Sequence, residues 1–109
     1  MIPSQMLKGV LEGCILSVIE KKQVYGYEIS QMLEEYGFGM ISEGTIYPIL
    51  LRIEKNQWVG TELKESPTGP KRKYYYLNQT GREKLLEFKE NWVEITEAVE
   101  KVIDGGRNE

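Results

Sequence analysis

The residues that most often carry out chemistry in proteins are scarce in this sequence. Histidine is absent, and the one cysteine, Cys14, lies in the apolar stretch GCILSVI. Without histidine, the usual templates for nucleophilic hydrolysis and for zinc binding are missing. A thiol in apolar surroundings is typical of an inert core residue, and the glutamates fall at the spacing of solvated helix faces. We therefore expect no enzyme and no metal or cofactor site.

Basic side chains form the first candidate binding group. The formal net charge is −3, yet residues 64–82 contain five basic and one acidic side chain, a local charge of +4. This segment includes the triplet Lys71, Arg72 and Lys73. A compact basic feature binds phosphate even when the rest of the chain is acidic. We predict that the triplet contacts the phosphates or the minor groove of DNA, with a merely solvated turn as the alternative.

The second candidate group lies in EGTIYPILLRIEKNQWV, Glu43 to Val59. Apolar residues recur at helical spacing from Ile46 to Ile53, which predicts a helix with an inward stripe. Polar residues occupy its start and its other faces, where a recognition helix reaches phosphates and base edges. The predicted DNA contacts in this helix are Ser42, Thr45, Tyr47 and Arg52.

Pro48 lies inside this helical pattern. Proline is tolerated in the first turn, where its missing N–H costs little. We therefore expect the ordered turns to begin near Gly44 or Thr45. A helix that starts after Ser42 and kinks at the proline is the alternative.

The elements before this helix are two further helices. The first is expected in SQMLKGVLEGCILSVIEKK, with Ser4 as its N-cap. The second lies in VYGYEISQMLEEYGFG, where Gly37 and Gly39 mark its end. Both stretches place apolar residues three and four positions apart, as a buried stripe requires.

The pattern changes to that of strands after Val59. VGTELKES alternates with Val59, Thr61 and Leu63 on one face, PTGP is turn-forming, and KRKYYYLN alternates with Tyr75 and Leu77 inward. Two such strands predict a β-hairpin with a basic loop at its tip. Three helices followed by a hairpin predict a winged helix-turn-helix, mainly α with a small β-hairpin.

A long amphipathic helix is expected from about Thr80 to Ile103. Leu86, Val93 and Ile103 form a second apolar stripe that flanks the heptad seam. One apolar stripe would be enough to dock this helix on its own domain, so the second stripe points to a second chain and a homodimer. We divide the chain into a DNA-binding domain, residues 1–78, and a C-terminal dimerisation helix and tail, residues 79–109. The heptad seam that we assign to the dimer interface is Leu85, Phe88, Trp92, Ile95, Val99 and Val102.

Several of these segments resemble one known family. YGYEI, GTIYPILLRIEK and KRKYYYLNQTG, with the tryptophan-containing final helix, are similar to PadR-family bacterial transcriptional regulators in their short form with a single C-terminal helix. The resemblance implies a dimeric winged-helix repressor of its own gene and of neighbouring transporter or stress genes. It is nearest to the multidrug-sensing repressors, in which the final-helix tryptophan lies at a pore in the dimer interface.

Trp92 is therefore a candidate ligand-binding residue. Its spacing indicates only dimer core, whereas the resemblance implies that it stacks on a planar aromatic compound. Gly9 and Gly13 are expected one turn apart in the first helix, which would leave a cavity against Trp92 lined by Met6, Gly13 and Leu16. Close helix packing at GVLEG is the competing explanation.

Together these patterns predict a dimeric, sequence-specific DNA-binding regulator, a repressor that reads an inverted-repeat operator in double-stranded DNA and is released by a planar aromatic ligand. The alternative is a winged-helix module that binds protein without specific DNA binding, which the acidic balance and Glu43 beside the reading end both permit. No apolar run approaches the roughly 20 residues that cross a bilayer, and no signal peptide is evident, so we expect a cytoplasmic protein without membrane contact.

Overall fold

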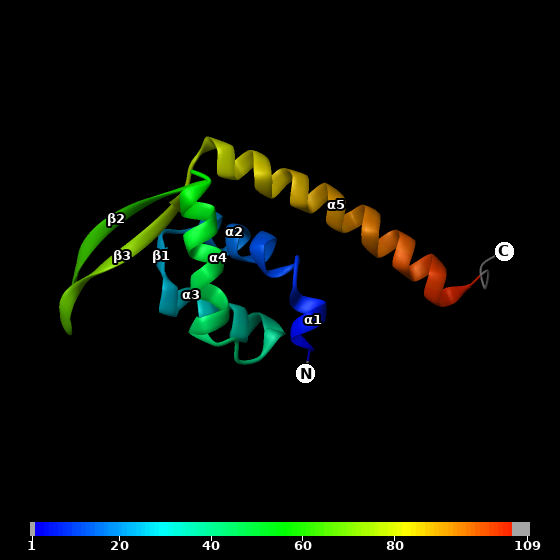
Figure 1. The fold of residues 1–109 in the computed structure, drawn as a ribbon, viewed down its shortest axis with the longest axis horizontal. Helices are drawn as coiled ribbons and strands as arrows, with labels where there is room; N and C mark the ends of the chain where they lie inside the picture. Colours follow the sequence, from blue (N-terminus) through cyan, green and yellow to red (C-terminus); the bar gives the residue numbers. More distant parts are fainter. Residues whose placement is uncertain (1, 106–109) are drawn as a thin grey trace.

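The elements of the chain assemble into a winged helix from which one long helix projects (Figure 1). The computed structural model describes residues 2–105. That part measures 60 × 30 × 20 Å, because the wing and the end of the long helix point away from each other. In chain order the elements are α1 (Ser4–Leu7), α2 (Leu11–Lys21), β1 (Val24–Tyr25), α3 (Gly26–Leu33), the π-helix η1 (Glu34–Phe38), α4 (Glu43–Lys55), β2 (Val59–Ser66), β3 (Gly69–Leu77) and α5 (Gln79–Asp104).

The first predicted helix is broken into α1 and α2. Gly9 between them has φ +91°, a left-handed conformation that glycine adopts without steric cost. Ser4 is the first helical residue, following Pro3, and not the N-cap. The prediction of one continuous helix was wrong because the apolar spacing continues across the break. Gly9 and Gly13 consequently do not lie on successive turns of one helix.

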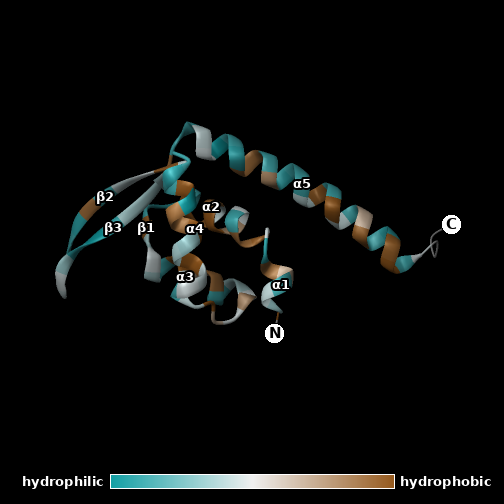
Figure 2. Ribbon diagram, in the orientation of Figure 1, coloured by the Kyte–Doolittle hydropathy of each residue, from teal (hydrophilic) through white to brown (hydrophobic). Residues whose placement is uncertain are grey.

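The core lies where α2, α3 and α4 meet the sheet. Ile15, Ile29 and Ile53, one from each helix, have no exposed surface. Tyr75 and Leu77 of β3 are buried beside them, as their alternation predicts. In Figure 2, brown, apolar stretches of α2, α3 and α4 lie at this junction, and further ones recur along α5. Burial of these inward faces explains why three short helices hold a defined angle to one another.

The wing is the hairpin of β2 and β3, to which β1 adds a third antiparallel strand in the order β1-β3-β2. Val24 pairs with Tyr75. Two residues are too few to show a strand period, so β1 had no signal in the sequence. Leu63, which alternates with Val59 on β2, is 65% exposed because the wing extends beyond the helices.

The final helix α5 begins where predicted, to within a residue. Asn78 caps it by accepting a 2.8 Å hydrogen bond from the Gly81 N–H, while its amide donates to the Gln57 carbonyl at 2.7 Å. Leu85 is only 1% exposed, so this residue, assigned above to the dimer interface, packs inside its own chain. Beyond Phe88 the helix leaves the core and its apolar side chains are exposed (Figures 1 and 2).

Candidate DNA interface and ligand groove

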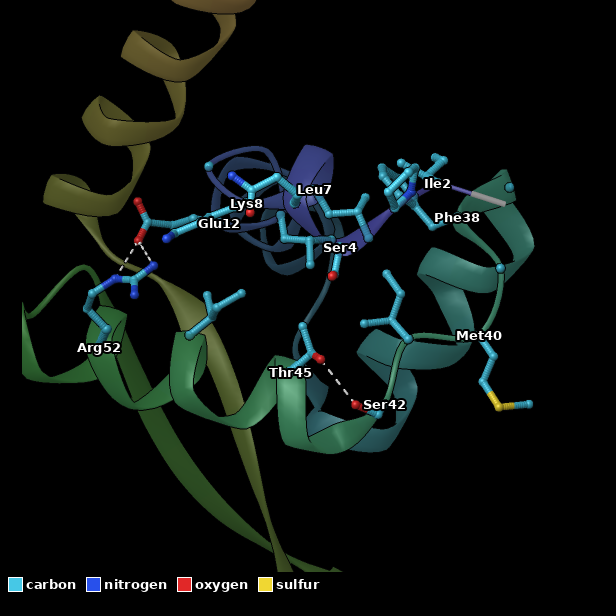
Figure 3. Close-up of a pocket in the computed structure, with 18 residues that line it drawn as sticks. Ile2, Ser4, Leu7, Lys8, Glu12, Phe38, Met40, Ser42, Thr45 and Arg52 are labelled. Atoms are coloured by element: carbon cyan, nitrogen blue, oxygen red, sulfur yellow. Dashed lines mark hydrogen bonds and ion pairs between the residues drawn. The ribbon is translucent and has the colours of Figure 1, made fainter.

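The N-terminus of α4 begins directly after Ser42. The Ser42 carbonyl accepts hydrogen bonds from the N–H groups of Thr45 and Ile46 at 3.0 and 3.2 Å. Its hydroxyl lies 3.1 Å from the Thr45 hydroxyl and does not cap the backbone (Figure 3). Because the Thr45 and Ile46 N–H groups are already bonded, the N–H groups of Glu43 and Gly44 are the ones left available to an anion such as a phosphate.

Pro48 is the sixth residue of α4, so the expectation of a first-turn proline was wrong. The helix nevertheless continues through it to Lys55. Proline has no N–H to donate to the carbonyl four residues earlier, that of Gly44. Both residues are exposed, so water can replace the missing bond. An exposed side of the helix is thus what allows proline there.

The exposed side of α4 follows a stripe that starts at Tyr47. Tyr47 is 54% exposed and Leu51, one turn later, is 51% exposed, while Ile46, Leu50 and Ile53 face the core. Tyr47 is therefore not part of the core packing. A helix with one side buried and the other side free is the element that can enter a DNA groove.

Arg52 does not share that exposed stripe. Its Nε and Nη2 atoms donate to Oε2 of Glu12 on α2 at 2.8 and 2.6 Å (Figure 3). Arg52 and Thr45 line a groove of about 940 Å³ between α4 and the N-terminal segment. The two Arg52 nitrogens bonded to Glu12 would reach DNA only if this ion pair broke. Glu12 is thus an ion-pair partner and not a solvated residue.

The basic triplet lies on β3 and not in the tip, because Ser66 and Gly69 already pair across the hairpin end. Successive side chains of a strand point to opposite faces. The Lys73 ammonium lies 2.7 Å from Oε1 of Glu54 on α4, whereas the Arg72 guanidinium lies over the Tyr25 ring at 4.5 Å. Lys71 has a looser contact, 3.8 Å from Glu65.

The pKa of Lys73 is raised above its usual range. The hydrogen bond to the Glu54 carboxylate is the largest cause, and the interactions with Tyr75 and Tyr47 act in the same direction. Lys73 is therefore held as a cation, and its nearest acidic partner belongs to α4. Nothing in the sequence singled out Glu54, since a glutamate near a helix end has no distinguishing pattern.

A second groove, of about 690 Å³, lies between the N-terminal segment and α5. Trp92 and Met6 line it, and the Trp92 ring lies 6.3 Å from that of Phe88. Leu16 is buried in the core, and Gly13 is covered by the Phe88 ring, which a methyl group at position 13 would overlap. Close packing, the alternative given above, thus accounts for Gly13.

Two further residues line this groove although the sequence did not place them there. They are Phe38, from η1, and Cys14. Burial raises the pKa of the Cys14 thiol, which keeps it protonated and unreactive, as expected for an inert cysteine. Phe38 follows Gly37, whose φ of +109° turns the chain there. A glycine-rich helix end gives no signal of which side chain will enter a groove.

The family model of PadR-like transcriptional regulators matches residues 15–87. The chain belongs to this family. PadR-like proteins are transcriptional regulators and not enzymes, in agreement with the prediction from the missing histidine. The resemblance drawn from the sequence motifs and the winged-helix fold are both confirmed.

Individual relatives agree with this assignment. A PadR-like transcriptional regulator from Bacillus cereus is 51% identical, with 94% of this chain and 99% of that chain covered and a TM-score of 0.83. An uncharacterized protein from Lysinibacillus sphaericus is 33% identical over 96% of this chain and 98% of its own. Bacillus subtilis PadR in complex with operator DNA is 27% identical, covering 72% of this chain and 47% of that chain, with a TM-score of 0.65.

Among residues 2–105, no helix of this PadR-like chain is long and apolar enough to cross a membrane.

Proposed function

We propose that this PadR-like protein is a homodimeric repressor that binds an inverted-repeat operator in double-stranded DNA. The observation that carries the proposal is the exposed stripe of α4, Tyr47 to Leu51, beside a wing with basic side chains. The relative from Bacillus subtilis was solved with operator DNA. In this assignment α4 enters the major groove, with Thr45 and Tyr47 near base edges and Lys71 and Arg72 near phosphates.

A dimer follows from the apolar surface of α5. Trp92, Ile95 and Val99 are between 45% and 56% exposed in the single chain, and Val102 is 80% exposed. A run of apolar side chains along one helix is a surface that a soluble chain covers with a partner. A second copy of α5 would cover it and would place two α4 helices about one DNA turn, roughly 34 Å, apart.

The test of DNA recognition is a gel shift on the DNA upstream of the protein's own gene, with random DNA of equal length as competitor. We expect the double variant Thr45→Ala and Tyr47→Ala to weaken specific binding by about 1 to 3 kcal/mol per lost base contact, with non-specific binding changed less. Equal losses on both DNAs would reduce these residues to phosphate-positioning roles. A wild-type protein that shifts neither DNA would favour the protein-binding module.

We propose further that a planar aromatic compound binds against Trp92 and releases the repressor from DNA. The support is the groove itself, which α5 and the N-terminal segment line with mostly apolar side chains, including Met6, Phe38 and Phe88. Apolar walls and an accessible indole suit a flat aromatic ring. Release requires that the compound bind the two dimer geometries with different affinity.

This ligand proposal is tested by titrating a planar cationic dye while tryptophan fluorescence is followed. We expect saturable quenching in wild type and its loss in Trp92→Ala. Trp58 is the internal control, because it lies outside the groove and its ring is covered by Lys84. Sedimentation of the variant should still show a folded dimer. Equal dye affinity in the two proteins would return Trp92 to a purely structural role at the dimer interface.

A further inference from the structure

The contact that joins the wing to the recognition helix is an ion pair between residues 19 positions apart. Oε1 of Glu54, in the last turns of α4, accepts a 2.7 Å hydrogen bond from the Lys73 ammonium of β3. The two side chains are 32% and 41% exposed, so the pair lies at the edge of the core and not in free solvent. Glu54 thus binds the Lys73 ammonium, the β3 cation that contacts α4.

The ion pair lies on the same side of α4 as Tyr47, the residue proposed to read DNA. Tyr47 precedes Glu54 by seven residues, two helical turns, and therefore lies on the same side of α4. The pair is consequently part of the surface where α4 and the wing would meet DNA together.

We propose that Glu54 is a positioning residue of the DNA interface, one that holds the wing at a fixed angle to α4 and withholds the Lys73 ammonium from phosphate. The proposal rests on the proposed function, DNA binding through α4 and the wing. A phosphate and the Glu54 carboxylate are competing acceptors for one ammonium. An ammonium held by its own chain adds nothing to sequence-independent binding, whereas a fixed wing angle favours the one DNA geometry that fits.

The proposal predicts that removing the Glu54 carboxylate raises the affinity for random DNA, whereas loss of an ordinary DNA contact lowers it. In Glu54→Gln the ammonium becomes free to bind phosphate, so affinity for random DNA should rise while the preference for operator falls. Each added phosphate contact steepens the slope of log K against log salt by about 0.9, hence by about 1.8 for a dimer. Between 50 and 200 mM salt, the variant should lose about tenfold more affinity for random DNA than wild type does.

Glu65→Gln is the matched control. It also removes one negative charge, from β2 of the wing, but its partner Lys71 is 3.8 Å away and both side chains are exposed. Any general gain in DNA affinity from the loss of one negative charge appears in both variants, and only the difference between them reports the held ammonium. Fluorescence anisotropy of labelled duplexes, random and promoter-derived, across a salt series gives the slopes.

Two further variants locate the effect on Lys73. Lys73→Met should leave the slope on random DNA unchanged, because the wild-type ammonium makes no phosphate contact there. The double variant Glu54→Gln with Lys73→Met should return to the wild-type slope. Thermal melts accompany each variant, and if Glu54→Gln does not fold, the Lys73→Met slope alone decides.

The proposal is overturned if Glu54→Gln and Glu65→Gln have equal slopes, if Lys73→Met flattens the slope by about 1.8, or if the double variant keeps the steeper slope. A loss of affinity on both DNAs with an unchanged slope would also overturn it, since it would make Glu54 a structural residue only. A wild-type protein that binds neither duplex would instead count against the proposed function.

Discussion

At the scale of single residues, the basic side chains of the wing differ in what they are free to bind. Lys73 is held at 2.7 Å by Glu54, and Arg52 of α4 is likewise held by Glu12. Lys71 has only an exposed contact, and Arg72 lies over the Tyr25 ring with a 3.5 Å hydrogen bond from Nη2 to the Thr68 hydroxyl. Neither cation is held by a close carboxylate as Lys73 and Arg52 are. Lys71 and Arg72 are accordingly the wing residues that we expect on phosphate.

The double variant Lys71→Ala and Arg72→Ala tests this assignment. It removes about four phosphate contacts per dimer, so the salt slope of DNA binding should flatten by about 3 to 4. The measurement is affinity on one duplex across a salt series. Lys101→Ala, which removes a cation near the far end of α5, should leave the slope unchanged. An unaltered slope in the wing variant would mean that these residues do not contact DNA.

At the scale of elements, α2 and α5 approach each other closely at one glycine. Gly13 of α2 faces the ring of Phe88 on α5, with no room for a side chain between them. Glycine is needed here for close approach and not for a turn, because its backbone is helical. This contact fixes the direction in which α5 leaves the core, and with it one wall of the Trp92 groove.

Gly13→Ala should therefore destabilise the protein despite the higher helix propensity of alanine. The added methyl group overlaps the Phe88 ring, and overpacking of this kind costs about 1 to 3 kcal/mol. Denaturation by urea measures the loss. Gly44→Ala is the control, because the nearest atom to its added methyl group is 3.7 Å away and the helix gains up to about 1 kcal/mol. Equal stability changes in the two variants would show that Phe88 moves aside freely.

At the scale of the whole molecule, the basic segment and the exposed apolar surface of α5 lie toward opposite ends of the long axis. The wing end contains the one basic segment, residues 64–82, whereas residues 83–109, mostly α5, contain eight acidic and four basic side chains. DNA would attract the first end and repel the second. The proposed dimer surface thus lies on the half of the chain that would face away from DNA.

The double variant Ile95→Glu and Val99→Glu should separate the dimer into folded monomers. Both positions are about half exposed in the single chain, so the substitutions leave its core intact, whereas in a dimer they would bury unpaired charges. Sedimentation gives the mass, and circular dichroism the fold. Lys101→Glu changes the charge by the same amount on the other side of α5 and should leave the dimer intact. An unchanged mass in a folded double variant would place the interface elsewhere.

Local signals in the sequence determined most of the elements. The spacing of apolar residues in α4 and α5, the turn residues of the hairpin and the alternation that buries Tyr75 and Leu77 each depend on neighbours within a few positions. The same signals identified Tyr47 as a residue off the apolar stripe, and Tyr47 is exposed. Local periodicity is a property of the chain alone, which is why these features could be predicted.

Only the tertiary structure decided which faces meet. Arg52 and Glu12 are 40 positions apart, and Glu54 and Lys73 are 19 apart, so no local pattern pairs them. The two-residue strand β1 exists because β3 offers it a partner, and Leu85 is buried because the start of α5 rests on the core. Whether a given side chain faces solvent, forms an ion pair or is buried thus depends on the element that folding places beside it. The local sequence does not contain that information.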